Sequence, residues 1–316
     1  MAIRYLTNVK HIGVIGECML ELSAFDVDSP MLKTMSFGGD TLNTAIYLAR
    51  SGANVHYFTA LGDDIHSNWM IQQWQRAGVH CDYVEQIEGR VPGLYMIDTD
   101  EKGERSFCYW RENSPARELF DQAERADKLF EALVQYDLVY LSGVTLSLYS
   151  DTALGRLLDF LTSYRQQGGV VAFDSNYREQ GWGDKDRAQS VYTDFYQQVD
   201  IALPTLDDEL DLFTFVGASE LHDLLSSFGV TEIVIKLGEQ GCLVTAEGGL
   251  QAVPAIPVDE VIDTTGAGDS FNAGYLSARI SGNTPAVAAQ TGHHYAAQVV
   301  RQRGAIVPIS IGSRLM

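Results

Sequence analysis

The sequence is poor in cysteine and lacks any long hydrophobic run. Its four cysteines are Cys18, Cys81, Cys108 and Cys242. They are widely spaced and include no C-x-x-C pair, which argues against a disulfide framework and against a cysteine zinc site. The first apolar stretch, residues 12–15, is interrupted by Gly13 and is too short for a signal-peptide core or a membrane span. We therefore expect a cytoplasmic protein that is neither secreted nor inserted in a membrane.

Positive charge is also scarce. The chain has 22 Lys and Arg against 42 Asp and Glu, which gives a formal net charge of -20. Such a chain repels the phosphates of nucleic acids and anionic membrane surfaces, so neither is an expected partner. An anionic small molecule would need a local site of backbone NH groups, a helix N-terminus and a few well-placed cations.

Linkers, internal repeats and low-complexity tracts are absent from the 316 residues. Hydrophobic residues make up 46% and charged residues 20%, which is ordinary for a folded globular protein. We therefore predict a single α/β domain over residues 1–316 with a small attachment.

Short apolar runs alternate with helical patterns along most of the chain. The predicted strands are 11–16, 55–62, 138–143, 170–176, 200–204 and 232–238. The predicted helices are 41–52, 67–78, 126–136, 151–169, 186–199 and 220–229. This order predicts a mostly parallel sheet with crossover helices on its faces.

Two segments break this alternation. Residues 17–37 and 90–112 are extended in pattern, with a turn-like stretch at 100–103. Together they predict a small β-sheet that projects from the core as a lid. From residue 263 to 274 the chain becomes rich in Gly, Ala and Thr, and the pattern is then helical to about Arg301.

The run DTTGAGDSFNAGYLSAR, residues 263–279, is typical of a loop that leads into a helix. The NH groups of Gly266, Ala267 and Gly268 would then lie at the helix N-terminus and form a site for a transferring phosphoryl group. Asp269, in the first turn, would accept the proton of a substrate hydroxyl, with magnesium bound to ATP. The alternative is a motif that only caps the helix. The pattern is neither a Walker loop nor the dinucleotide G-x-G-x-x-G, whose third glycine would fall on Phe271.

The sequence DTTGAGDSF resembles the C-terminal signature of the ribokinase-like PfkB carbohydrate kinases, and FGGDTLNTA at residues 37–45 resembles their N-terminal one. The resemblance extends from about residue 10 to about 308. It implies a three-layer ribokinase-like fold with a β-sheet lid and an ATP- and Mg2+-dependent sugar kinase. It also implies a homo-oligomer, because the exposed lid sheets of relatives often pair into dimers.

The same resemblance assigns roles to residues. Asp269 matches the family's catalytic base, and Gly266, Ala267 and Gly268 match its anion hole. The positions that match sugar-binding ones are Gly38, Gly39, Asp40 and Asn43. For Asp40, an N-cap of the following helix is the alternative role.

For the nucleotide, the matching positions are Thr205, Lys236, Gly238, Gly241, Gly266, Gly268 and His293. A surface lysine at a strand end is the alternative for Lys236, and a packing residue is the alternative for His293.

Two cation sites follow from the resemblance. Relatives carry N-x-x-E near the magnesium, whereas this chain has PTLDDE, with Thr205 in the Asn position. Asp208 or Glu209 could hold a magnesium-bound water, or both could only favour the helix dipole. Asp263 and Thr265 match positions that bind a monovalent cation such as K+ in some relatives.

Within the family, the stretches GVIGECMLELS, PGLYMIDTD, ERSFCYWR and FDSNYR resemble the 2-keto-3-deoxygluconate kinases. This similarity implies phosphorylation of 2-keto-3-deoxygluconate to 2-keto-3-deoxy-6-phosphogluconate. Arg111 and Arg178 would bind the substrate carboxylate, with Tyr95 and Tyr109 beside them. Surface ion pairs and packing are the alternatives for these four residues. The rival functions are a kinase of a neutral sugar or a nucleoside, a nicotinamide-dependent oxidoreductase, and a sugar-binding protein without activity.

Overall fold

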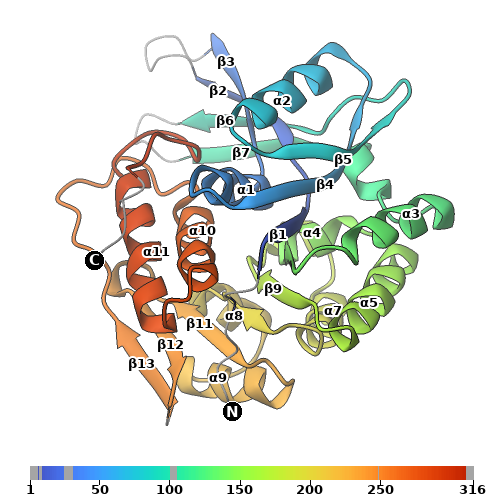
Figure 1. Ribbon diagram of the computed structural model, residues 1–316. Coiled ribbons are helices and arrows are strands. Elements are labelled where there is room, and N and C mark those ends of the chain that lie inside the picture. The colour runs from blue at the N-terminus through green and yellow to red at the C-terminus, as the bar shows by residue number, and fades with distance from the viewer. Residues whose placement is uncertain (1–5, 7–8, 25–30, 100–104, 248, 311–316) are drawn as a thin grey trace.

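The computed structural model describes residues 6, 9–24, 31–99, 105–247 and 249–310. Its main feature is a nine-stranded sheet with the order β13-β12-β11-β10-β9-β8-β1-β4-β5 (Figure 1). In chain order the strands are β1 (His11–Ile15), β4 (Asn54–Gly62), β5 (His80–Ile87), β8 (Leu138–Ser142), β9 (Val170–Asp174), β10 (Ile201–Ala202), β11 (Glu232–Lys236), β12 (Cys242–Ala246) and β13 (Gly249–Val253). From β5 to β11 all neighbours are parallel, and β12 and β13 continue the sheet antiparallel.

Helices cover both faces of this sheet. They are α1 (Asp40–Arg50), α2 (Ile65–Arg76), α3 (Ala123–Leu133), α4 (Gly143–Leu148), α5 (Asp151–Gln166), α6 (Glu179–Trp182), α7 (Lys185–Tyr196), α8 (Leu206–Leu212), α9 (Ala218–Ser227), α10 (Ala267–Ile280) and α11 (Pro285–Val299). Two short 3-10 turns accompany them, at Pro115–Glu118 and Gly238–Gln240. None of the described helices is both long enough and apolar enough to cross a bilayer.

Two hydrophobic cores define the three layers. Side chains of neighbouring strand residues point to opposite faces, so Val14 joins the core under α1, α10 and α11, whereas Ile15 joins the core under α3, α5 and α7. Strands β8, β9 and β11 are buried along their whole length, as expected for parallel strands covered on both faces. Figure 1 shows α10 and α11 on one side of the sheet and α5 and α7 on the other. The predicted three-layer fold is confirmed.

The predicted attachment is a separate four-stranded sheet with the order β3-β2-β6-β7. It consists of β2 (Met19–Ala24), β3 (Lys33–Gly38), β6 (Leu94–Thr99) and β7 (Arg105–Trp110). In Figure 1 it lies in the upper part of the view, next to α1 and α2. Both segments expected to form the lid contribute two strands each, while the predicted turn at 100–103 lies outside the described residues.

The C-terminal region differs from the expectation of one helical stretch to about Arg301. The chain forms two helices, because Gly282 has a left-handed φ of 89° and Thr284 caps a new helix that starts with Pro285. Strands β5, β12 and β13 were not predicted either. A single domain over residues 1–316 stays a prediction, because the described residues do not cover the whole chain.

Candidate active site

The loop before α10 is fixed by Asp263. Its carboxylate accepts hydrogen bonds from the Thr265 amide (3.0 Å), the Thr265 hydroxyl (2.7 Å) and the Gly304 amide (2.7 Å). Gly266 is the N-cap of α10 with φ 74°, and a Cβ there would lie 2.8 Å from the Cα and carbonyl oxygen of Ala305. Only glycine fits both the left-handed backbone and this close approach.

The amides at the start of α10 differ in what they can bind. Among the hydrogen bonds of the described residues, none is donated by the Gly268 or the Asp269 amide to the loop that precedes the helix. The predicted anion hole needs a correction at Ala267, whose amide donates to the Thr264 carbonyl (3.1 Å), because the turn before the helix closes there. The helix N-terminus can still hold an anion through its dipole and the remaining amides.

Asp269 lies in the first turn of α10 and is 9% exposed. Asn43 on α1 donates a hydrogen bond of 2.8 Å to its Oδ2, and the Thr44 hydroxyl donates to its backbone carbonyl (3.2 Å). Burial, and after it the negative charge of Asp40, raises the pKa of Asp269 to about 8, while Asn43 and Lys236 oppose the rise. A carboxyl group with this pKa can take up a proton near neutral pH, as a general base must.

Asp40 faces the same site from α1. Its alternative role as an N-cap is wrong, because Gly39 is the N-cap and Asp40 is the first helical residue. The Asp40 carboxylate accepts from the Thr41 amide and from Asn176 Nδ2, both at 2.8 Å. Burial raises its pKa. Asn176 has φ 34° and is the one non-glycine residue with positive φ in the described part of the chain.

The glycines Gly38 and Gly39 allow the lid sheet to lie against α1. A Cβ at Gly38 would lie 2.2 Å from the Tyr95 hydroxyl, and one at Gly39 would lie 2.2 Å from the Glu17 carbonyl oxygen. At Gly39 the backbone itself excludes a side chain, whereas at Gly38 the obstacle is the hydroxyl at the end of the Tyr95 side chain.

Lys236, at the end of β11, is buried and belongs to a polar network. Its Nζ lies 3.0 Å from Asp174 Oδ1 and 3.3 Å from Asn272 Oδ1. Asn272 also donates to Asp174 Oδ2 (2.8 Å) and to the Tyr140 hydroxyl (3.1 Å). A Cβ on Gly268 would lie 3.7 Å from Lys236 Nζ, so the ammonium group is next to the N-terminus of α10. The surface alternative for Lys236 is therefore wrong.

The two magnesium candidates in the first turn of α8, Asp208 and Glu209, differ in their exposure to solvent. Glu209 is fully buried and accepts a hydrogen bond of 2.5 Å from the Tyr196 hydroxyl, and burial raises its pKa to about 7. It is in no position to reach a hydrated ion at the surface. Asp208 is partly exposed and pairs with Arg178 at 2.8 Å. Thr205 is the N-cap of α8 but makes no side-chain cap hydrogen bond.

Arg111 and the tyrosines lie on the lid side of the site. The guanidinium of Arg111 pairs with Glu17, which is only 4% exposed, and lies 5.9 Å from the centre of the Tyr109 ring. This is a buried pair, unlike an ordinary surface ion pair. Tyr95 donates to Glu21, and the rings of Tyr95 and Tyr109 are 5.9 Å apart. Burial raises the pKa of Tyr95, so its hydroxyl stays a donor.

The remaining nucleotide candidates lie along β11–β13 and α11. Gly238 and Gly241 flank the turn between β11 and β12 with φ 58° and 105°. His293 is buried with its Nε2 3.2 Å from the Val253 carbonyl oxygen, and its ring lies 4.9 Å from Phe271. These contacts favour the packing alternative for His293.

Three residues of this site were missed in the sequence. Asp174 is the last residue of β9 and Asn176 is two residues after it, and Asn272 lies one turn after Asp269 on α10. The position of the first two at the carboxyl end of a parallel strand was the signal that could have found them, because open α/β sheets bind ligands at that edge.

Three known proteins show what the chain is similar to. It is 44% identical over 309 residues to the 2-dehydro-3-deoxygluconokinase of Dickeya dadantii, which covers 96% of this chain and 98% of that protein. The solved 2-dehydro-3-deoxygluconokinase of Thermotoga maritima superposes with a TM-score of 0.84 at 22% identity, covering 95% of this chain and 97% of that one. A protein of Escherichia coli assigned as ribokinase II and solved with ATP and Mg2+ gives a TM-score of 0.83 at 22% identity, covering 94% and 95%.

These likenesses agree with the two glycine signatures of the sequence. Residues 9–311 match the pfkB family of carbohydrate kinases. Both the fold and the family expected from the signatures are thereby confirmed, and the chain belongs to the pfkB family of carbohydrate kinases.

Proposed function

We propose that this protein transfers the γ-phosphoryl group of ATP to 2-keto-3-deoxygluconate, also called 2-dehydro-3-deoxygluconate, and forms 2-keto-3-deoxy-6-phosphogluconate. The high identity to kinases named for this substrate supports the choice. The observation that carries the proposed chemistry is Asp269, a buried carboxyl group with a raised pKa beside the N-terminus of α10.

In the proposed reaction Asp269 accepts the proton of the sugar hydroxyl farthest from the carboxylate. The Gly268 amide and the α10 dipole lie next to Asp269 in the first turn of the helix, and the Lys236 ammonium is beside Gly268. Together they would stabilise negative charge on the phosphoryl group. Asn43 orients the carboxylate through its 2.8 Å hydrogen bond. No covalent intermediate with the protein is needed, because positioning and charge stabilisation suffice for phosphoryl transfer.

Arg111 and Arg178 are the proposed partners of the substrate carboxylate. Each is already paired with a carboxylate, Arg111 with Glu17 and Arg178 with Asp208. The Arg178 side chain is 55% exposed and has donors left for a ligand. Closure of the small sheet over the sugar would exclude water, which could otherwise accept the phosphoryl group.

The residues also fit the proposed cations to different degrees. Mg2+ prefers carboxylate oxygens, and Asp208 offers one at the partly exposed start of α8. We therefore retain Asp208 as the proposed magnesium residue and no longer propose Glu209. When bound, the ion would neutralise phosphate charge. For a monovalent cation such as K+, Asp263 and Thr265 remain the proposed pair.

Assembly and location stay predictions. The lid sheet presents large apolar side chains to solvent, among them Phe107, Tyr109 and Trp110 on β7. Such a patch supports the expected homo-oligomer, because an exposed apolar surface usually marks an interaction site. A cytoplasmic location remains expected from the cysteine usage.

A substrate screen tests the proposal. ADP release would be measured with sugar acids, neutral sugars and nucleosides, and the product would be examined by NMR to locate the phosphate. We expect turnover with 2-keto-3-deoxygluconate and phosphate on its terminal hydroxyl. Faster turnover of fructose, ribose or a nucleoside would replace the proposed substrate by the rival one.

A further inference from the structure

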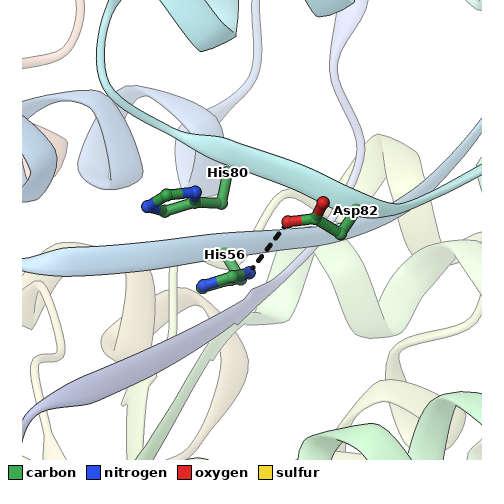
Figure 2. Close-up of side chains that lie close together, drawn as sticks. All are labelled: His56, His80 and Asp82. Atoms are coloured by element: carbon green, nitrogen blue, oxygen red, sulfur yellow. Dashed lines mark ion pairs between the residues drawn. The ribbon is translucent and has the colours of Figure 1, made fainter.

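A group of metal-ligating side chains lies on the edge of the large sheet, away from the site described above. His56 is near the start of β4, and His80 and Asp82 are at the start of the edge strand β5 (Figure 2). The two strands are parallel, and His56 is the register partner of His80. The pairing of β4 with β5 therefore brings the three side chains together from two separate segments of the chain.

The alternation of side chains along β5 brings the carboxylate to the histidines. Asp82 is two residues after His80 in the same strand, so the two side chains share a face. The pairing with β4 is irregular next to them, because the register shifts between His56 and Phe58 and two residues of β5, Cys81 and Asp82, oppose one residue of β4. Asp82 Oδ2 consequently lies 3.5 Å from His56 Nδ1, as the dashed line in Figure 2 shows.

The donor atoms of the three residues all lie within 4.8 Å of one another. The rings of His56 and His80 are stacked with centroids 4.4 Å apart and an interplanar angle of 15°. The His56 Nδ1 is buried and makes no hydrogen bond among the described residues, and the Asp82 carboxylate at 3.5 Å faces it without reaching hydrogen-bond geometry. A buried polar atom with only such a distant partner is better satisfied by a closer ligand.

We propose that His56, His80 and Asp82 bind one Zn2+ ion. Two imidazole nitrogens and one carboxylate oxygen form a ligand set that suits Zn2+, with water as the fourth ligand. Bonds of about 2.1 Å require donor atoms roughly 3.4 Å apart in a tetrahedron. Reaching this spacing requires the exposed side chains of His80 and Asp82 to change rotamer. The His80 ring must rotate out of its stack on His56, because the nitrogen lone pairs of two stacked rings do not point at one ion.

His56 is suited to be the fixed ligand. It is largely buried and packs against the Tyr136 ring at 5.2 Å, so its position is set by the core. Cys81 is no competing ligand, because its Sγ points to the carbonyl oxygens of Ile71 and Val79 and burial raises its pKa to about 12.

The place of the group in the sheet indicates a structural role. It lies at the amino ends of β4 and β5, whereas Asp174 and Lys236 lie at the carboxyl ends of parallel strands in the same sheet. The ion would therefore lie far from the proposed site of phosphoryl transfer. It would link the edge strand β5 to its neighbour β4. Edge strands have one unpaired side and profit from such a restraint.

Zinc binding by the full-length protein tests this proposal. Titration calorimetry with ZnCl2 would be done in a Cys108→Ser background, because Cys108 is an exposed free thiol that could bind zinc itself. We expect one equivalent to bind, with affinity at least about tenfold lower in His80→Ala and in Asp82→Asn, since even outer partners of a zinc ligand contribute tenfold or more. Co2+ in place of Zn2+ should give the visible absorption of a tetrahedral site.

The control variant is His222→Ala, which removes a second His–Asp pair, His222 with Asp223 at 3.6 Å, that has no third ligand in the described chain. It should bind zinc like the parent. Zinc should also raise the Tm of the parent but not of His80→Ala. No saturable binding by the parent, or equal binding by the His80 and Asp82 variants, would overturn the proposal.

Discussion

The side-chain amide of Asn43 donates a 2.8 Å hydrogen bond to Asp269 Oδ2, although the two residues are 226 positions apart in the chain. This contact joins α1, which follows the lid strand β3, to α10, the helix that carries the proposed base. It stabilises the ionised carboxylate and so opposes the rise in pKa that burial causes. The competition between these two effects determines how readily Asp269 can accept a proton.

Replacing Asp269 with Asn should lower kcat by about 10²–10⁴-fold, because the amide cannot accept the proton of the substrate hydroxyl. The KM for the sugar should change little, since the amide keeps the size of the carboxyl group. Steady-state kinetics with the coupled ADP assay measure both values. Retention of most of the turnover would contradict the role of Asp269 as the base.

Removal of the Asn43 amide should shift the pH dependence of catalysis. Without this donor the pKa of Asp269 rises above its value of about 8, so in Asn43→Ala the rise of kcat/KM with pH should occur at higher pH. The midpoint of the pH profile is the diagnostic measurement, because a loss of sugar contacts would lower the plateau without moving the midpoint. An unchanged midpoint would argue against this coupling.

The raised pKa of Asp269 also affects stability. Its carboxyl group has a pKa of 3.8 in the unfolded chain and about 8 in the fold, so the folded state binds the proton more strongly. The stabilisation is present below pH 3.8 and is lost as the pH rises through about 8. Urea titrations between pH 5 and 9 should show a steeper fall of the free energy of unfolding for the parent than for Asp269→Asn. Equal slopes would contradict the shift.

Gly266→Ala should destabilise the fold more than an ordinary left-handed glycine substitution. An alanine with φ 74° costs about 1–2 kcal/mol, and its Cβ would in addition meet the Ala305 backbone at 2.8 Å. The matched control is Gly52→Ala, with φ 91° and nothing within 4 Å. Chemical denaturation compares the two, and equal losses would show that the contact with Ala305 is absent.

Lys236→Met should leave Asp174 buried without its cation. Breaking a buried pair in this way costs about 3–5 kcal/mol, because one charge stays in the interior uncompensated. The double variant Asp174→Asn with Lys236→Met removes both charges and should recover much of that loss, while activity stays low. A single variant as stable as the parent would contradict the buried pair.

The roles of Arg111 and Arg178 can be distinguished by measuring both the stability of each variant and its KM for the sugar acid. Arg111→Ala should raise the KM for the sugar acid but also destabilise the protein, because Glu17 is then buried without a partner. Adding Glu17→Gln should restore stability and not KM. Arg178→Ala should raise KM with a smaller loss of stability, since its pair with Asp208 is exposed on the arginine side. Unchanged KM in all three variants would favour a neutral substrate.

Much of the fold was predictable from local patterns. The buried strands and amphipathic helices repeat with clear periods, and Gly39 and Gly266 of the two glycine motifs mark close backbone approaches that few other residues permit. The strands β5, β12 and β13, at the two ends of the sheet order, were not predictable in the same way, because few of their residues are buried and they form no continuous apolar run. The boundary between α10 and α11 depends on one left-handed glycine and a threonine cap.

The sequence by itself determined the three-layer fold, the family and the residue types of the site, because these depend on periodicity and on short motifs that act locally. Only the tertiary structure decided the partners: Asn43 for Asp269, Asp174 and Asn272 for Lys236, and Glu17 for Arg111. Partners of this kind come from distant segments that meet at strand ends and helix termini. Burial of these contacts between distant segments sets the pKa values and the stability of each pair, and no local sequence pattern contains that information.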